Sequence, residues 1–145
     1  MKVCFMFGHR DCPETVLSDL TQAIIKYYNE YGISIFYVGN RGQFDALAAK
    51  AVHIVKQKHP DIELYLLLAY HPAERTPDTY GFDGSYYPPL ENVPHPYAIV
   101  QGNRYMAENA DVIICYVSHL GNTRNLLEYI KKKKPGIPIY NLAEK

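Results

Sequence analysis

Residues 34–52 read SIFYVGNRGQFDALAAKAV. An apolar strand-like run, Ser34–Val38, leads through the turn Gly39-Asn40-Arg41-Gly42 into an alanine-rich helical pattern. A strand that turns into a helix in this way directs free backbone N–H groups and the positive end of the helix dipole at one spot. The turn therefore predicts an anion site, to which Arg41 adds a planar, bidentate charge. The alternative is that the turn only connects the strand to the helix and binds no ligand. Asp45 either stabilises the helix N-terminus by its charge or binds a ligand hydroxyl.

The same strand-to-helix pattern extends along the whole chain. Continuous apolar strands that alternate with amphipathic helices indicate a parallel sheet covered on both faces. We therefore expect one α/β domain over residues 1–145, a three-layer Rossmann-like sandwich with a five-stranded sheet in the order 3-2-1-4-5. The predicted strands are Val3–Phe7, Ser34–Val38, Glu63–Tyr70, Val112–Val117 and Ile137–Asn141. The predicted helices are Glu14–Tyr31, Phe44–His59, Ala98–Asn109 and Thr123–Lys134.

Composition excludes several classes of protein. Fifteen basic and fifteen acidic residues cancel, so no net charge attracts nucleic acid or an anionic membrane. No apolar run approaches the roughly 20 residues of a membrane-spanning helix, and the N-terminal strand does not read as a signal peptide. We expect a cytoplasmic protein with no membrane partner. Fourteen tyrosines suit a ligand site or a homo-oligomer interface.

Cysteine and histidine spacing gives no sign of a metal site or a catalytic triad. The three cysteines, Cys4, Cys12 and Cys115, are odd in number and lack the C-x-x-C spacing of zinc ligands. No Ser-His-Asp constellation is recognisable. We therefore expect neither a metal nor a cofactor.

Ligands of such sheets bind beyond the carboxyl ends of the strands, at the point where the strand order reverses. Three glycine-containing loops should meet there: residues 8–12, 39–42 and 118–123. Four polar residues of this region also have an interpretation without a ligand: a solvated loop for His9 and Arg10, a surface charge for Arg104 and a helix N-cap for Thr123. The candidate ligand-binding residues are Gly8, His9, Arg10, Gly39, Asn40, Arg41, Gly42, Asp45, Asn103, Arg104, Gly121, Asn122 and Thr123. The Pro- and Tyr-rich connection at about 71–96 is predicted to be a loop, either a functional lid or a mobile excursion.

Four segments together resemble one known group of proteins. They are FGHR (7–10), GNRGQFDALAAK (39–50), NRYM with ADVII (103–106 and 110–114) and GNTRNLLEY (121–129). In this order they resemble the SLOG superfamily, named for Smf/DprA and LOG proteins. Within it they are most similar to the small bacterial and phage proteins of the YpsA and YoqJ type. The resemblance spans almost the whole chain and implies a Rossmann-like fold and a nucleotide-related ligand.

The sequence departs from the LOG enzymes of that superfamily at their catalytic signature. That signature, P-G-G-x-G-T-x-x-E, needs a glutamate shortly after its threonine, whereas Thr123 is followed by Arg124, Asn125 and Leu126. Asn122 replaces the second glycine of the G-G-T pattern. No tryptophan is available to stack on a base, so Tyr80, Tyr86 or Tyr87 is expected to do so.

The function expected from these features is binding of a nucleotide or nucleotide derivative, with phosphates at the strand-to-helix turns. An alternative is a nucleoside-monophosphate N-glycosidase (LOG-like phosphoribohydrolase) or ribosyltransferase. Its carboxylate would be Glu128, Asp45 or Asp83, and Arg104 is a further weak catalytic candidate. A second alternative, DprA-like binding of single-stranded nucleic acid, is disfavoured by the neutral charge.

Overall fold

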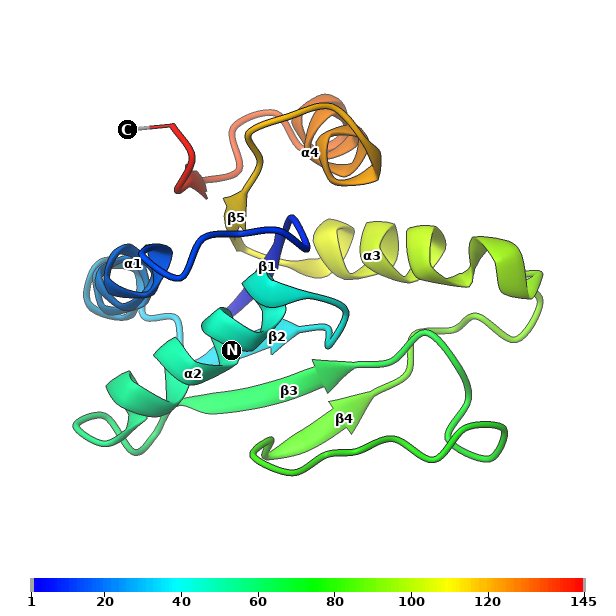
Figure 1. The fold of residues 1–145 in the computed structure, drawn as a ribbon, viewed down its shortest axis with the longest axis horizontal. Helices are drawn as coiled ribbons and strands as arrows, with labels where there is room; N and C mark the ends of the chain where they lie inside the picture. The colour runs from blue at the N-terminus through cyan, green and yellow to red at the C-terminus, as the bar shows by residue number, and fades with distance from the viewer. Residues whose placement is uncertain (1, 145) are drawn as a thin grey trace.

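The computed structural model describes residues 2–144. Within them, parallel strands form a single six-stranded sheet in the order β4-β3-β2-β1-β5-β6 (Figure 1). The strands are β1 (Val3–Gly8), β2 (Ile35–Val38), β3 (Glu63–Leu67), β4 (Gly84–Tyr86), β5 (Val112–Tyr116) and β6 (Ile139–Asn141). The helices are α1 (Val16–Tyr31), α2 (Gln43–Lys56), the short 3-10 helix η1 (His95–Tyr97), α3 (Ala98–Asn109) and α4 (Asn122–Lys133).

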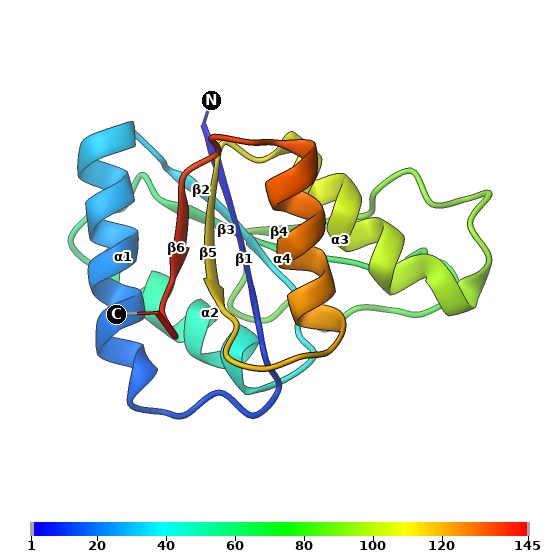
Figure 2. The ribbon, with the colours of Figure 1, turned by 90° about the horizontal axis from the view of Figure 1, so that it is seen from above.

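Helices cover both faces of the sheet, so the molecule has three layers (Figure 2). Along β1, Cys4 and Met6 pack into the cluster formed with α1 and α2, whereas Phe5 and Phe7 pack into the cluster formed with α3 and α4. This alternation is the period of two that a strand requires. The β1 residues are buried on both sides, which explains why the strand reads as a continuous apolar run.

The expected α/β architecture is confirmed, but the predicted number of strands is wrong by one. The five predicted strands keep their expected order, and β4 adds a sixth at the edge, beside β3. The connection at 71–96 is therefore not a simple loop, because it contains β4 and enters η1. The β3 strand also ends at Leu67, earlier than the expected Tyr70.

Local hydrogen bonds explain how so short a strand forms at β4. The Leu68 N–H donates to the Tyr86 carbonyl at 2.8 Å, and the Asp83 N–H donates to the Leu64 carbonyl at the same distance. The Asp83 carboxylate also accepts the Leu64 N–H at 2.8 Å and pairs with Lys56 at 2.7 Å. These contacts are made with β3 and α2, so the sequence of residues 84–86 alone carries no pattern that predicts a strand.

Among the described residues, no helix combines the length and the apolar character needed to cross a membrane.

Candidate ligand-binding cavity

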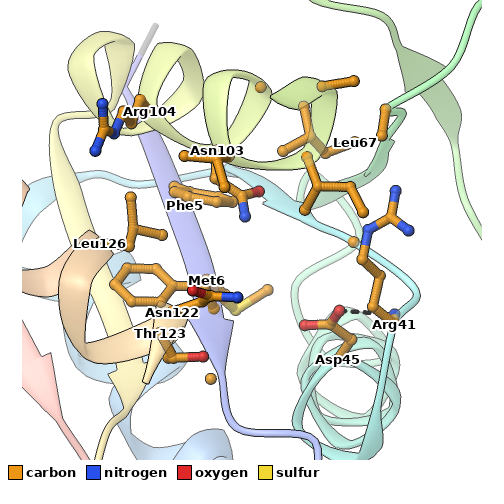
Figure 3. A pocket seen from close by; sticks show the side chains of 18 of the residues that line it. Phe5, Met6, Arg41, Asp45, Leu67, Asn103, Arg104, Asn122, Thr123 and Leu126 are labelled. Carbon is orange, nitrogen blue, oxygen red and sulfur yellow. Dashed lines mark hydrogen bonds between the residues drawn. The ribbon is translucent and has the colours of Figure 1, made fainter. Parts of the chain in front are cut away.

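A cavity of about 350 Å³ opens at the carboxyl ends of β1, β2 and β3, on the side of the sheet that α3 and α4 cover. Its volume falls within the range of small-molecule sites. Side chains of β1, β3 and α4 give it an apolar lining that includes Phe5, Phe7, Leu67 and Leu126. Figure 3 shows Arg41 and Asp45 on one side of the cavity and Asn122 and Thr123 on the other.

Nine of the predicted binding residues line this cavity: Gly8, Arg10, Gly39, Arg41, Asp45, Asn103, Arg104, Asn122 and Thr123. Residues of all three loops predicted from glycine and polar residues therefore line one cavity. His9, Asn40, Gly42 and Gly121 lie outside the lining. The sequence did not predict the apolar lining, because Phe5 and Phe7 have the pattern of ordinary strand residues. Only their place in the strand before the first predicted loop could have indicated that they line a cavity.

None of the three tyrosines expected to stack on a base lines the cavity. The Tyr86 ring packs beside Tyr37 and Tyr105, the Tyr87 ring contacts His71, and Tyr80 is 94% exposed. The aromatic rings in the lining are instead those of Phe5 and Phe7.

The turn before α2 satisfies two of its own backbone N–H groups. The Arg41 N–H donates to Asp45 Oδ2 at 2.9 Å, and the Gln43 N–H donates to the Arg10 carbonyl at 3.0 Å. Asp45 also places a negative charge in the first turn of α2, where the helix dipole favours it. Of the two predicted phosphate positions, this one is therefore already occupied in part by the protein's own acceptors.

Close packing accounts for two of the glycines at this edge. A Cβ atom on Gly8 would lie 2.5 Å from Cγ of Phe44, and one on Gly42 would lie 2.6 Å from Cα of Arg10. Gly42 has an extended backbone with φ of −178°, so its constraint is the close approach of the two loops. These glycines bring the segments after β1 and β2 into contact.

Neither α2 nor α4 has a side-chain cap, but the first N–H group of α2, that of Gln43, has a backbone acceptor and the first N–H group of α4 has none among the described residues. The Asn125 N–H bonds to the Gly121 carbonyl at 3.0 Å, and the N–H groups of Asn122, Thr123 and Arg124 find no acceptor among the described residues. Thr123 is therefore not the N-cap: Gly121 occupies that position, with φ of 143°. Asn122 and Thr123 line the cavity, so free donors and the positive end of the helix dipole face it.

Asp45 is the one acidic residue in the cavity lining. Burial raises the pKa of its carboxyl group to about 6, although the Arg41 N–H and the charges of Arg41 and Arg10 act in the opposite direction. The other two carboxylates considered for catalysis lie elsewhere. Glu128 is exposed and outside the lining, and Asp83 binds Lys56 and the Leu64 N–H beside β4.

None of the five arginines forms an ion pair with a described residue. Arg10 and Arg41 line the cavity, and Arg75 stacks over the Tyr70 ring with its guanidinium carbon 4.1 Å from the ring centroid. The guanidinium of Arg104 lies over Tyr129 at 4.5 Å, and Nε of Arg124 is buried without a partner. Arg10 and Arg41, which line the cavity without an ion pair to a described residue, are therefore available to an anionic ligand.

His9 fixes the loop after β5. Its ring is buried, and Nε2 accepts the N–H groups of Ser118 at 2.9 Å and His119 at 3.2 Å. The neutral ring therefore carries its proton on Nδ1. Burial, and then the charge of His119, lowers the pKa of His9, which keeps Nε2 free to accept. His9 thus positions the loop that leads into α4.

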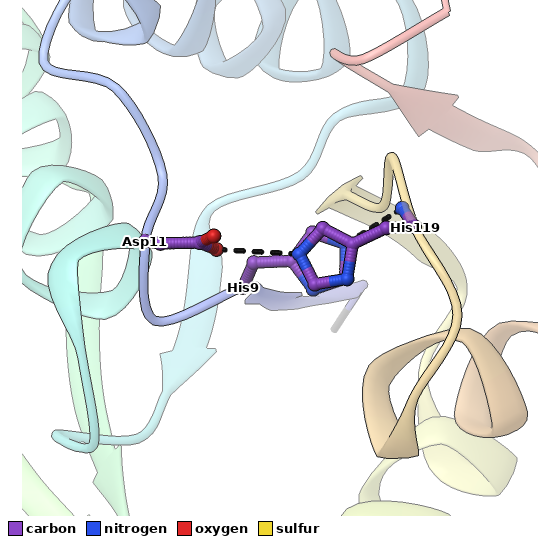
Figure 4. A group of neighbouring side chains, drawn as sticks. All are labelled: His9, Asp11 and His119. Carbon is purple, nitrogen blue, oxygen red and sulfur yellow. Dashed lines mark hydrogen bonds and ion pairs between the residues drawn. The ribbon is translucent and has the colours of Figure 1, made fainter.

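His119 stacks on His9 with the ring centroids 3.6 Å apart (Figure 4). Its Nδ1 lies 3.0 Å from the Leu120 carbonyl and its Nε2 lies 3.4 Å from Asp11 Oδ1. These two acceptors raise the pKa of His119. An imidazolium with both N–H groups satisfied suits this position.

His9, Asp11 and His119 each offer one potential metal ligand, with the ligand atoms within 4.8 Å of one another. A neutral imidazole has a single lone pair in its plane, and in His9 that lone pair already accepts two backbone N–H groups. His9 can join a metal only by releasing the loop after β5. The cluster therefore fits loop fixation better than metal binding.

No protein-family model matches the chain, and no curated protein matches it. Among solved structures, the chain is similar to the Moco carrier protein from Chlamydomonas reinhardtii, with a TM-score of 0.56 and 12% sequence identity over 98% of this chain and 91% of that one. It also matches a response regulator from Thermotoga maritima, with a TM-score of only 0.31 and 8% identity over 70% of this chain and 99% of that one. The likeness to the carrier protein shows the fold alone, which is Rossmann-like α/β.

Proposed function

We propose that the cavity binds a nucleotide or nucleotide derivative of the SLOG type, with a phosphate group held at the start of α4. The observation that carries this proposal is the uncapped N-terminus of α4, whose Asn122 and Thr123 face a cavity of about 350 Å³. Free N–H groups and the helix dipole favour a phosphate there. The apolar surface of Phe5, Phe7 and Leu126 suits a flat base.

Charge supports the same proposal. Arg10 lies in the lining without an ion pair to any described residue, so its charge is available to a phosphorylated ligand. The motif resemblance to SLOG proteins adds support from the sequence. The likeness to a Moco carrier protein adds none, because at 12% identity it transfers no ligand. A cytoplasmic location and self-association are further parts of the proposal, and they rest on composition.

Two substitutions at one position test the phosphate site. Asn122 is the first residue of α4, where proline is compatible with a helix, so Asn122→Pro removes one free N–H without removing a helical hydrogen bond. Asn122→Ala removes the side chain and keeps the N–H. By calorimetric titration with AMP, we expect a loss of affinity of about tenfold for the proline variant, the equivalent of one charge-assisted hydrogen bond, and a much smaller loss for the alanine variant.

Adenosine, which lacks the phosphate, should bind the wild-type protein and both variants equally weakly. The same experiment would reject the proposal if AMP bound no better than adenosine. Equal AMP affinity for the two Asn122 variants, both well folded, would also reject it.

The second candidate function is cleavage of an N-glycosidic bond, and Asp45 is the observation that favours it. A carboxyl group in the cavity with a pKa of about 6 is suited to general acid–base chemistry near neutral pH. Incubation with AMP should then release free adenine, which chromatography detects, and Asp45→Asn should abolish the release. If the wild-type protein binds AMP and releases no adenine, it binds this nucleotide without cleaving it.

A further inference from the structure

We infer that the cavity binds a second anionic group of its ligand, a phosphoryl group, at the arginine cluster formed by Arg10, Arg41 and Arg75. The inference rests on the proposed function and specifies the ligand as one with at least two phosphoryl groups. Arg10 and Arg41 line the cavity, and Arg41 lies on the Asp45 side, opposite the start of α4 (Figure 3). Arg75 lies outside the lining, near enough to Arg41 to act on its charge.

Three loops bring these arginines together. Arg10 follows β1 and Arg41 follows β2, and the bond from the Gln43 N–H to the Arg10 carbonyl joins their segments at 3.0 Å. Gly42 lets Cα of Arg10 approach closely. Arg75 comes from the segment after β3, where its guanidinium is held over Tyr70. The two loop contacts fix the spacing of Arg10 and Arg41 before any ligand arrives.

The charges in this cluster do not balance. Arg75 and Arg10 both repel the charge on Arg41, whose guanidinium is partly buried, and burial is the main cause of its lowered pKa. Asp45 is the nearby acid in the lining, and its Oδ2 is already engaged by the Arg41 N–H. None of the three arginines forms an ion pair with any residue in the described part of the chain. One carboxylate against three guanidinium groups leaves a net positive charge that a phosphoryl group would neutralise.

The position of the cluster separates it from the phosphate site at α4. Asn122 and Thr123 lie across the cavity from Arg41, so the two sets of donors face the cavity from different sides (Figure 3). Arg41 and Arg75 come from the segments after β2 and β3, whereas the α4 site lies after β5. A ligand with a second phosphoryl group would span the cavity between the two sets of donors.

Calorimetric titrations with AMP, ADP and adenosine 3′,5′-bisphosphate test this inference. We expect ADP, adenosine 3′,5′-bisphosphate or both to bind about tenfold more tightly than AMP, because the second phosphoryl group forms new charge-assisted hydrogen bonds. The ligand that gains affinity tells whether the second group follows the first directly or lies across the ribose. Arg41→Gln and Arg75→Gln should each remove most of the gain in affinity over AMP.

Lys50→Gln is the matched control, because Lys50 is an exposed cation on α2, the helix that follows Arg41. It should preserve the gain. Equal affinity for AMP, ADP and adenosine 3′,5′-bisphosphate would overturn this inference and leave the proposed function intact. A gain in affinity that survives both arginine substitutions would do the same. Absence of binding by all three nucleotides would overturn both proposals.

Discussion

Asp45 combines two features that its position in the sequence does not predict together: a hydrogen bond within the turn and a place in the cavity lining. The sequence offers two roles for it, a favourable charge at the helix start or a hydroxyl ligand. In the structure it accepts the Arg41 N–H at 2.9 Å and lines the cavity at the same time. Its burial raises its pKa to about 6, so the charged form is disfavoured relative to an exposed aspartate. A group of this kind lowers stability at neutral pH, which is typical of residues retained for function.

Replacement of Asp45 by asparagine should therefore stabilise the protein in a pH-dependent way. The folded-state pKa of about 6 lies above the ordinary value of 3.8, so folded protein binds the proton more tightly and loses stability as pH rises between these values. The amide oxygen of the new side chain would keep an acceptor for the Arg41 N–H. We expect Asp45→Asn to raise the free energy of unfolding by up to about 3 kcal/mol at pH 8 and by little at pH 4. Urea unfolding at the two pH values measures this, and an equal effect at both would contradict it.

His9 was predicted as a ligand-binding residue, and in the structure its ring instead binds the loop after β5. Sequence places it directly after β1, in a loop that does reach the cavity, but nothing in the sequence shows which way the ring turns. The ring points toward the loop after β5, because two unpaired N–H groups there need an acceptor.

His9→Ala should leave the Ser118 and His119 N–H groups without their acceptor and cost about 1–3 kcal/mol of stability. His119→Ala is the comparison variant, since it removes the exposed ring of the stacked pair and leaves both backbone bonds in place. We expect it to cost less than about 1 kcal/mol. Urea unfolding at pH 8 compares them, and equal losses would contradict the role assigned to His9.

At the level of elements, the strands and helices with strong periodic patterns were predictable and β4 was not. The α3 bounds, Ala98–Asn109, agree with the prediction, and the β1, β2 and β5 runs lie where continuous apolar residues indicate them. Three residues of β4, in contrast, form a strand because β3 offers an open edge and Asp83 ties the segment to Leu64 and Lys56. Tertiary contacts of this kind leave no periodic signal in the segment itself.

The two helix starts at the cavity illustrate the same limit. Both were predicted as anion sites from glycine and polar residues, but the α2 start is closed in part by Asp45 and by the Arg10 carbonyl. Neither start has a side-chain cap, but only at α4 do the first three N–H groups all lack an acceptor among the described residues. Arg75 was missed because it lies in the long connection after β3, and only the fold brings its charge near Arg41.

Contact between the loops after β1 and β2 depends on Gly42. In Gly42→Ala the new Cβ would lie 2.6 Å from Cα of Arg10, so the two backbones must separate. We expect a loss of about 1–3 kcal/mol, the usual cost of overpacking, together with weaker nucleotide binding. Gly102→Ala is the control, because the Cβ would meet nothing closer than 3.4 Å and alanine favours a helix interior. Equal unfolding midpoints for the two variants would show that the loops do not depend on Gly42.

For the whole molecule, a net charge of zero conceals an uneven distribution of arginine. All five arginines lie in segments that follow carboxyl ends of strands or in the cavity lining, and none pairs with a described acid. The ion pairs among the described residues use lysine, as in Lys56 with Asp83, or histidine, as in His95 with Glu74. The guanidinium groups are thus left without acidic partners, although composition alone indicates no anionic ligand.

Amide chemical shifts during titration with AMP, with adenosine in parallel, test the phosphate site at α4 most directly. The backbone amides of Asn122, Thr123 and Arg124 lack acceptors among the described residues and should form hydrogen bonds with the phosphate. We expect saturable shifts of these three amides with AMP, larger than any shift in residues 39–42, and none of comparable size with adenosine. Unchanged amides at 122–124 in the AMP-saturated protein, or equal shifts with adenosine, would contradict a phosphate site at α4.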